Sequence, residues 1–420
     1  MSCFRSRRMA ATVLLALVAL AAAVAGCGGS GGGSSAPTTT ATTAANAPTG
    51  APLRIAAFVN ATGQVLSGEQ HAADVLQAWA RAANAAGGVA GHPVDVVVED
   101  TRGDAPTASA KAAAVAADHS IVAALMFDSG IEGVIARGLT KAGIPVVGGM
   151  GYLPTIWGAL PNWLPLATTF PSVLNAGMVM AQQLGARTVS YAVCAEFAGC
   201  AAGAPLAQTA AQKLGLRYAG TLKVSSSAPD YTAECLGIKS KGVDYVMVGL
   251  PSATAMRFIR ACKTQGYAGQ WGMTDGAIEP QAMSANDPGV TIHVGLTAFP
   301  WFTNDAPVVA YRRTMTAQGV QESSWGDPHG TAAYAAMELL RTTLDAARGT
   351  LPARPTRADV VNAYAAVRDE TLGGLLAQPV TFTPNAPEKP VSCYWIGTFQ
   401  GGRFGGATLG DPTCDPSSLG

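Results

Sequence analysis

The segment 84–104 sets the strongest limit on how this chain can fold. It reads Asn-Ala-Ala-Gly-Gly-Val-Ala-Gly-His-Pro, followed by Val-Asp-Val-Val-Val-Glu-Asp-Thr-Arg-Gly-Asp. Gly87 and Gly88 can adopt the left-handed conformation that ends a helix. The valines that follow are nearly unbroken, which is typical of a strand covered on both faces. A helix end, a tight turn and a buried strand in direct succession indicate an α/β fold.

The same succession repeats along the chain. Short apolar stretches alternate with segments whose apolar residues recur at helical spacing. We expect strands at 55–59, 94–98, 121–126, 144–147, 188–193, 217–224, 245–250, 270–273 and 292–296, and short strands within 379–404. Helices are expected between the strands and at 306–318, 330–348 and 357–367. A Pro- and Trp-rich crossover, 154–171, separates two series of similar size, which predicts two lobes, each with a parallel, doubly wound sheet.

The N-terminus has the layout of an export signal. Arg5, Arg7 and Arg8 precede an apolar run, 9–25, that leads into Val-Ala-Gly and Cys27. This ending resembles the lipobox of bacterial lipoprotein signal peptides, which implies cleavage before Cys27 and a lipid on that cysteine. A signal anchor or a plain secretory peptide is the alternative, because a run of this length is marginal for spanning a bilayer.

The residues after Cys27 are almost wholly Gly, Ser, Thr, Ala and Pro as far as residue 50. Such a composition cannot bury enough apolar surface to fold and forms a flexible tether. We therefore expect a signal peptide at 1–26 and a lipidated cysteine with its linker at 27–52. The folded part would be anchored at the extracytoplasmic face of the membrane.

The charge balance argues against a nucleic-acid partner. Without the three arginines of the signal, 27 − 3 = 24 basic residues remain against 27 acidic ones, a net charge of −3. Neither an excess of basic residues nor a basic run is present, so the electrostatic footprint of nucleic-acid binding is missing.

An ordered set of short motifs resembles the solute-binding proteins of ABC transporters, of the type I, leucine/isoleucine/valine-binding family. The resemblance covers about 53–382 and depends on the order and spacing of the motifs. They are Thr62-Gly63, Asn84 to Gly88 with Gly91 and Pro93, Glu99-Asp100 with Gly103-Asp104, Gly143-Ile-Pro145, Asp230-Tyr231, Gly242-Val-Asp244, Gly266 and Asp275-Gly276.

The resemblance implies two Rossmann-like lobes joined by a three-crossing hinge. It places 53–168 and 306–367 in lobe 1, and 169–305 and 368–420 in lobe 2 and its tail. It further implies a monomer without a cofactor, which captures a small molecule between the lobes and delivers it to an ABC permease in the membrane. A sensor of the same fold that signals to a membrane receptor is the alternative.

The resemblance also implies the ligand-binding residues. The turn at Ser129 and Gly130 precedes a helix, where free backbone N–H groups and the hydroxyl can receive a ligand carboxylate. Asp275 would take a ligand ammonium, and Phe197 would close over the ligand. The loop that contains Gly149, Met150 and Tyr152 would add carbonyl and hydroxyl contacts.

Each of these residues also has a purely structural interpretation. Ser129 and Asp275 can simply cap the following turns, Phe197 can belong to the core, and Met150 and Tyr152 can pack in the hinge. The family carries a smaller residue at the position of Tyr152, so the pocket is reshaped. We therefore expect a small polar or amphipathic ligand, such as an amino acid or a related amide or organic acid, rather than a branched-chain amino acid in particular.

Cysteine usage fits an oxidising compartment. Apart from Cys3 in the signal and Cys27, the chain has six cysteines, which allow many pairings. From the expected topology we predict the disulfides Cys194–Cys200, Cys235–Cys262 and Cys393–Cys414. A metal cluster is the alternative, but neither a Cys-x-x-Cys motif nor clustered histidines support it.

An enzyme is the main competing class. His71, His92, His119, His293 and His329 are scattered without metal-binding spacing. The sequence also lacks a Gly-x-Ser-x-Gly elbow, a phosphate loop and a dinucleotide fingerprint after a strand. We therefore expect a binding protein and assign no catalytic residue.

Overall fold

A computed structural model describes residues 47–63, 68–151, 153–196 and 202–414. Four of the residues singled out from the sequence lie outside these ranges: Cys27, Tyr152, Phe197 and Cys200. The expected signal peptide and most of the linker lie outside them as well. Among the described residues, no helix is both long enough and apolar enough to cross a membrane.

The first sheet has five parallel strands in the order β2-β1-β3-β4-β5. They are β1 (Leu53–Val59), β2 (Val94–Asp100), β3 (Ile121–Met126), β4 (Val146–Gly149) and β5 (Trp163–Leu164). The valine-rich β2 is an edge strand, which pairs with β1 alone among the described residues. Val96 and Val98 pack against one core cluster and Val97 against the other, so both faces are covered as expected, although most of the strand is only half-buried.

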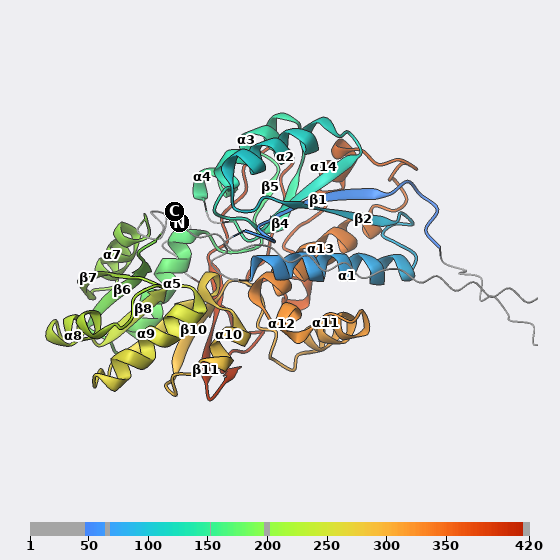
Figure 1. The fold of residues 1–420 in the computed structure, drawn as a ribbon. Coiled ribbons are helices and arrows are strands. Elements are labelled where there is room, and N and C mark those ends of the chain that lie inside the picture. Colours follow the sequence, from blue (N-terminus) through green and yellow to red (C-terminus); the bar gives the residue numbers. More distant parts are fainter. Residues whose placement is uncertain (1–46, 64–67, 152, 197–201, 415–420) are drawn as a thin grey trace, which may run out of the picture. The chain divides into compact units, whose positions relative to one another are not determined.

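Helices cover both faces of this sheet (Figure 1). On one face, the cluster formed by α1 (Glu69–Ala85) and α13 (Pro328–Ala346) packs against Ile55, Ala57 and Val59 of β1. On the other, α2 (Ala105–Ala117) and α3 (Glu132–Lys141) pack against Ala56 and Phe58. Successive strand side chains point to opposite faces, so a nearly continuous apolar strand supplies both cores. The first sheet is doubly wound, as expected.

The second sheet is mixed. Five parallel strands, β6 (Thr188–Cys194), β7 (Arg217–Val224), β8 (Tyr245–Gly249), β9 (Gln270–Thr274) and β10 (Ile292–Leu296), are followed by the antiparallel strands β11 (Cys393–Gln400), β12 (Arg403–Gly405) and β13 (Thr413–Cys414). The expectation of a wholly parallel sheet is therefore corrected by the tail, which adds the antiparallel strands. The accompanying helices are α5 (Phe170–Gln183), α7 (Ala204–Lys213), α8 (Thr232–Ser240), α9 (Ser252–Thr264) and α10 (Pro280–Ala285).

Two disulfides join cysteines that both lie within the described residues. Cys235–Cys262 joins α8 to α9, and Cys393–Cys414 joins β11 to β13. These are two of the three pairings that we predicted. The third involves Cys200, which lies outside the described residues.

The chain passes between the two sheets three times. It leaves the first sheet after β5, returns after β10, and crosses again between α14 (Arg357–Tyr364) and β11. The crossover 154–171 is more regular than expected, because it contains the short helix α4 (Pro154–Trp157) and supplies β5 to the sheet. After the second crossing, α11 (Ala306–Ala317) and α12 (Glu322–Trp325) pack against α1. On this basis we propose the lobe boundaries 53–168 with 306–367 and 169–305 with 368–420.

Candidate ligand-binding site

The turn after β3 carries the predicted site residues Ser129 and Gly130. The N–H of Ser129 donates to the carbonyl of Phe127 at 3.0 Å, and the N–H of Gly130 donates to Asp128 Oδ1 at 3.1 Å. The N–H of Ile131 donates to the carbonyl of Asp128. These N–H groups are therefore not free for a ligand carboxylate, and that part of the prediction is wrong because the turn consumes them itself. The half-buried Ser129 and the exposed Gly130 stay candidate ligand contacts.

Asp128, which directly precedes Ser129, fixes this end of β3. Its carboxylate is 2% exposed and accepts a hydrogen bond from the Thr101 hydroxyl, which follows β2. Burial raises the pKa of Asp128, and the hydrogen bonds from Thr101 and Gly130 offset only part of that effect. The turn thus places an acidic group, not a set of free N–H donors, at the carboxyl end of the sheet.

Gly149 and Met150, at the end of β4, have structural roles. Gly149 has a φ of +126°, and a Cβ atom there would lie 1.8 Å from the carbonyl oxygen of Met126, so only glycine fits. The N–H of Met150 donates to the same oxygen at 2.8 Å, and its side chain is 1% exposed within the core. In this structure Met150 is a packed core residue, which agrees with the structural alternative given above.

Asp275 is fully buried at the carboxyl end of β9. Its carboxylate accepts the N–H of Thr297 at 2.7 Å, the Thr297 hydroxyl, and the N–H of Gly276 at 2.9 Å. Burial raises the pKa of Asp275, against the effect of these hydrogen bonds. Asp275 therefore ties the end of β9 to the start of the crossing after β10, which agrees with the capping alternative.

A cluster of buried titratable side chains lies where the first turns of α1 and α13 meet. Sequence reasoning missed this cluster. We call it the two-helix cluster; it consists of Glu69, His71, Asp327 and His329. Asp327 Oδ2 lies 3.4 Å from His71 Nδ1, and Asp327 Oδ1 lies 3.2 Å from His329 Nδ1. Asp327 also accepts the N–H of His329 at 2.8 Å, which caps α13. All four residues are at least nine-tenths buried.

The helix starts help to explain how a carboxylate can be buried here. Gly68 precedes α1 with a φ of +60°, and a Cβ atom on it would lie 2.6 Å from Asp327 Oδ2. The missing side chain thus lets the N-terminus of α1 approach Asp327 closely. Asp327 lies at the N-terminal ends of two long helices, whose dipoles favour a negative charge.

The environment of the two-helix cluster shifts its pKa values in opposite directions. Burial alone would raise the pKa of Asp327, but His329 and His71 hold it below its ordinary value. Burial would likewise lower the pKa of His71, but Asp327 raises it overall. The pKa of Glu69 is raised well above its usual range, first by burial and then by the neighbouring charge of Asp128. Asp327 is therefore an anion at neutral pH, whereas the folded state favours the protonated form of Glu69.

Groups from the second sheet face this cluster. Asp275 acts electrostatically on His329, and Glu279, which precedes α10, acts on His71. The carboxyl ends of β3 and β9 thus carry acidic groups, Asp128 and Asp275, whose charges are coupled to this cluster. One oxygen of Glu69, Oε2, is buried without a hydrogen-bond partner among the described residues. Within the same residues, no three potential metal ligands are grouped so as to hold an ion.

The signals for this cluster in the sequence were weak. His71 and Asp327 are far apart along the chain, and neither belongs to a motif of recognisable spacing. The helix expected at 330–348 is confirmed as α13, which begins two residues earlier, at Pro328. Nothing in the sequence indicated that the start of α1 would lie against it.

Comparison with known proteins agrees with the two-sheet architecture. A model of the periplasmic binding protein family matches residues 52–403. A branched-chain amino acid ABC transporter protein from Thermus thermophilus, solved with bound valine, has a TM-score of 0.74 at 16% identity, over 87% of this chain and 97% of that one. A leucine-binding protein from Thermotoga maritima has a TM-score of 0.68 at 16% identity, over 87% and 100%.

The proteins of similar structure differ in the ligands that they contain. The solute-binding protein of an ABC transporter from R. palustris, in complex with 4-hydroxybenzoate, has a TM-score of 0.67 at 17% identity, over 87% of this chain and 97% of that one. No curated protein sequence matches the chain. The family match spans most of the chain, and the fold and the motif order agree with it. The chain therefore belongs to the periplasmic binding protein family, as its resemblance to leucine/isoleucine/valine-binding proteins indicated.

Proposed function

We propose that this protein captures a small polar ligand between its two lobes and delivers it to an ABC importer. The observation that carries the proposal is that Asp275, after β9, and Glu279, before α10, act electrostatically on His329 and His71 at the starts of α13 and α1. Polar groups of both sheets are thus coupled in one region, and ligands of open α/β sheets bind at the carboxyl ends of the strands. Family membership supports the solute-binding role.

The acidic character of the region favours a ligand with an amino or amide group. Glu69, Asp128 and Asp275 all lie there, and Glu69 has an unpartnered carboxyl oxygen. An ammonium or amide N–H of the ligand would satisfy that oxygen, whereas an aromatic acid without a nitrogen group offers no N–H donor there. We therefore propose an amino acid or a related amide in preference to an aromatic acid. Ser129, Gly130, Tyr152 and Phe197 stay proposed contacts.

We propose further that a lipid on Cys27 holds the protein at the extracytoplasmic face of the membrane, next to its permease. The composition of the linker supports this arrangement, since a flexible tether would let the folded part dock on a membrane partner. Mass spectrometry of the membrane-extracted protein tests the anchor: a diacylglyceryl group on Cys27 is the expected result. A free or unprocessed N-terminus would contradict it.

The ligand is tested by a thermal-shift screen of the purified chain against amino acids, amides, urea, polyamines and aromatic acids. A ligand that binds only the folded state raises the melting temperature with its concentration. We expect hits among amino acids or amides. Hits confined to aromatic acids would contradict the proposed ligand class, and turnover of a compound would contradict the binding-protein proposal itself.

A further inference from the structure

A second site lies away from the two-helix cluster. It is a pocket of about 810 Å³ lined by α10, β12, the crossing after β10, α11 and α12. Its volume falls within the range of about 300–1,000 Å³ that is common for small-molecule sites. Neither Ser129, Asp128 or Asp275 nor any member of the two-helix cluster lines it. It is therefore distinct from the site proposed above.

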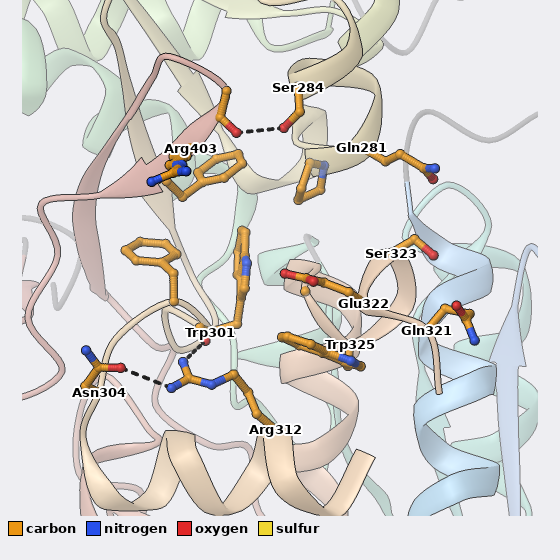
Figure 2. A pocket seen from close by; sticks show the side chains of 15 residues that line it. Gln281, Ser284, Trp301, Asn304, Arg312, Gln321, Glu322, Ser323, Trp325 and Arg403 are labelled. Atoms are coloured by element: carbon orange, nitrogen blue, oxygen red, sulfur yellow. Dashed lines mark hydrogen bonds between the residues drawn. The ribbon is translucent and has the colours of Figure 1, made fainter. Parts of the chain in front are cut away.

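Four aromatic side chains line this pocket: Trp301, Phe302, Trp325 and Phe404. Phe404 lies 5.1 Å from Trp301, 6.0 Å from Phe302 and 5.0 Å from Phe399, measured between ring centroids. Figure 2 shows the Trp301 ring on one side of the space, and Trp325 with Glu322 on the other. Two aromatic surfaces that face one space can hold a planar ligand between them.

Some polar side chains that line the pocket have no partner among the described residues. Arg403, Glu322 and Gln281 are exposed, and their side chains make no hydrogen bond or ion pair with any described residue. Arg312, by contrast, donates to the carbonyls of Trp301 and Thr303, each at 2.6 Å, and to Asn304. Arg312 thus shapes the crossing, while Arg403 is available to a ligand.

The charge of the lining favours an anion. Arg312 and Arg403 contribute two positive charges against the one negative charge of Glu322, a net of +1. Arginine binds carboxylates through two parallel hydrogen bonds and also stacks on aromatic rings. We propose that this pocket binds a planar aromatic compound with a carboxylate, whose ring lies between Trp301 and Trp325 and whose carboxylate meets Arg403.

The test is calorimetric titration of the purified chain with indole-3-acetate, a planar aromatic carboxylate. We expect saturable binding of one molecule per chain. Arg403→Ala should weaken it by about tenfold or more, because a charge-assisted, bidentate contact is lost. Arg403→Lys should restore only part of the affinity. The matched control is Arg313→Ala, an exposed arginine on α11 that does not line the pocket.

A second pair of variants locates the probe and distinguishes the two sites. Trp325→Phe should keep the fold and weaken binding, whereas Glu69→Met should leave it unchanged. The proposal is overturned if the folded wild type does not bind the probe, or if Arg403→Ala binds it as the wild type does. Loss of binding in Glu69→Met with full binding in Arg403→Ala would instead place the probe in the site between the lobes. Neither result depends on whether the thermal-shift screen finds an amino acid or amide.

Discussion

His71 Nδ1 lies 3.4 Å from Asp327 Oδ2, and the two side chains are 11% and 0% exposed. This buried ion pair holds the first turn of α1 against the first turn of α13. Asp275 and Glu279, which belong to the second-sheet part of the chain, act electrostatically on the histidines at the starts of these two helices. The pair therefore links the stability of the fold to the geometry of the proposed ligand site.

We predict that Asp327→Asn destabilises the protein by about 3 kcal/mol or more, because removal of one partner leaves buried charge without compensation. The cap of α13 on the N–H of His329 would also be weakened. Chemical denaturation at pH 7 measures the loss. Asp411→Asn, at an exposed aspartate, is the control and should stay within about 0.5 kcal/mol of the wild type. An equally small loss for Asp327→Asn would contradict this account.

The pH dependence of this ion pair has a defined sign. The pKa of His71 is raised above 6.5, so its contribution is complete below about pH 6.5 and is lost as the pH rises through the raised value. The pKa of Asp327 is lowered below 3.8, so its contribution is lost only as the pH falls through that lowered value. We expect the free energy of unfolding to decrease between pH 6 and pH 9, and to decrease less in His71→Gln. Unchanged slopes in that variant would show that His71 is not charged in the folded state.

Glu69 should contribute in the same direction for a different reason. Its raised pKa means that the folded state keeps a proton that the unfolded chain releases above about pH 4.5. Glu69→Gln imitates the protonated acid and should become more stable than the wild type as the pH rises. The difference should grow by up to about 1.4 kcal/mol per pH unit. Unfolding curves of both proteins at pH 5, 6 and 7 measure it, and parallel profiles would rule out the neutral acid.

Asp275 should act mainly through Thr297. The N–H and the hydroxyl of Thr297 both donate to Asp275 Oδ2. Asp275→Asn replaces one carboxylate oxygen by an N–H donor and should cost about 1–3 kcal/mol of stability. Thr297→Val should cost a similar amount, and the double variant should cost less than the sum of the two, since the partners share one network. Additive losses would mean that the two residues act independently.

The disulfide between α8 and α9 should contribute substantially to stability. Cys235 and Cys262 are 27 residues apart, and a cross-link of this span is worth about 3–4 kcal/mol when its effect on the unfolded chain is considered alone. The variant with both residues changed to alanine should show this loss in denaturation under oxidising conditions. The wild type under the same oxidising conditions is the comparison, and a loss below about 1 kcal/mol would contradict the prediction.

Local sequence patterns were sufficient for most of the fold. The strands at β2 and β3 and the helix that begins near residue 330 were predicted from short-range signals, because periodicity depends on neighbours in sequence. The antiparallel tail and the half-buried state of β2 were not predicted. They depend on which strand lies at the edge of a sheet, and that is decided by distant pairing.

The candidate site was predicted less well, for a related reason. The turn at Ser129 was located correctly, but its N–H groups are consumed by Phe127 and Asp128, whose backbone geometry the sequence does not reveal. The two-helix cluster joins residues that are far apart along the chain. Gly68, which lets α1 approach Asp327, carries no side chain and therefore no chemical signal that could have indicated the contact.

We propose that the ligand is held by polar groups at the start of α1, between the two sheets. Calorimetric titration of wild type and Glu69→Met with the best amino acid or amide from the screen tests this position of the ligand. Glu234→Met is the matched control, because Glu234 also lies in the first turn of a helix but lies outside the proposed site. We predict that Glu69→Met weakens binding by about tenfold or more, while Glu234→Met binds as the wild type does. Equal affinity of the folded Glu69→Met variant and the wild type would contradict the claim.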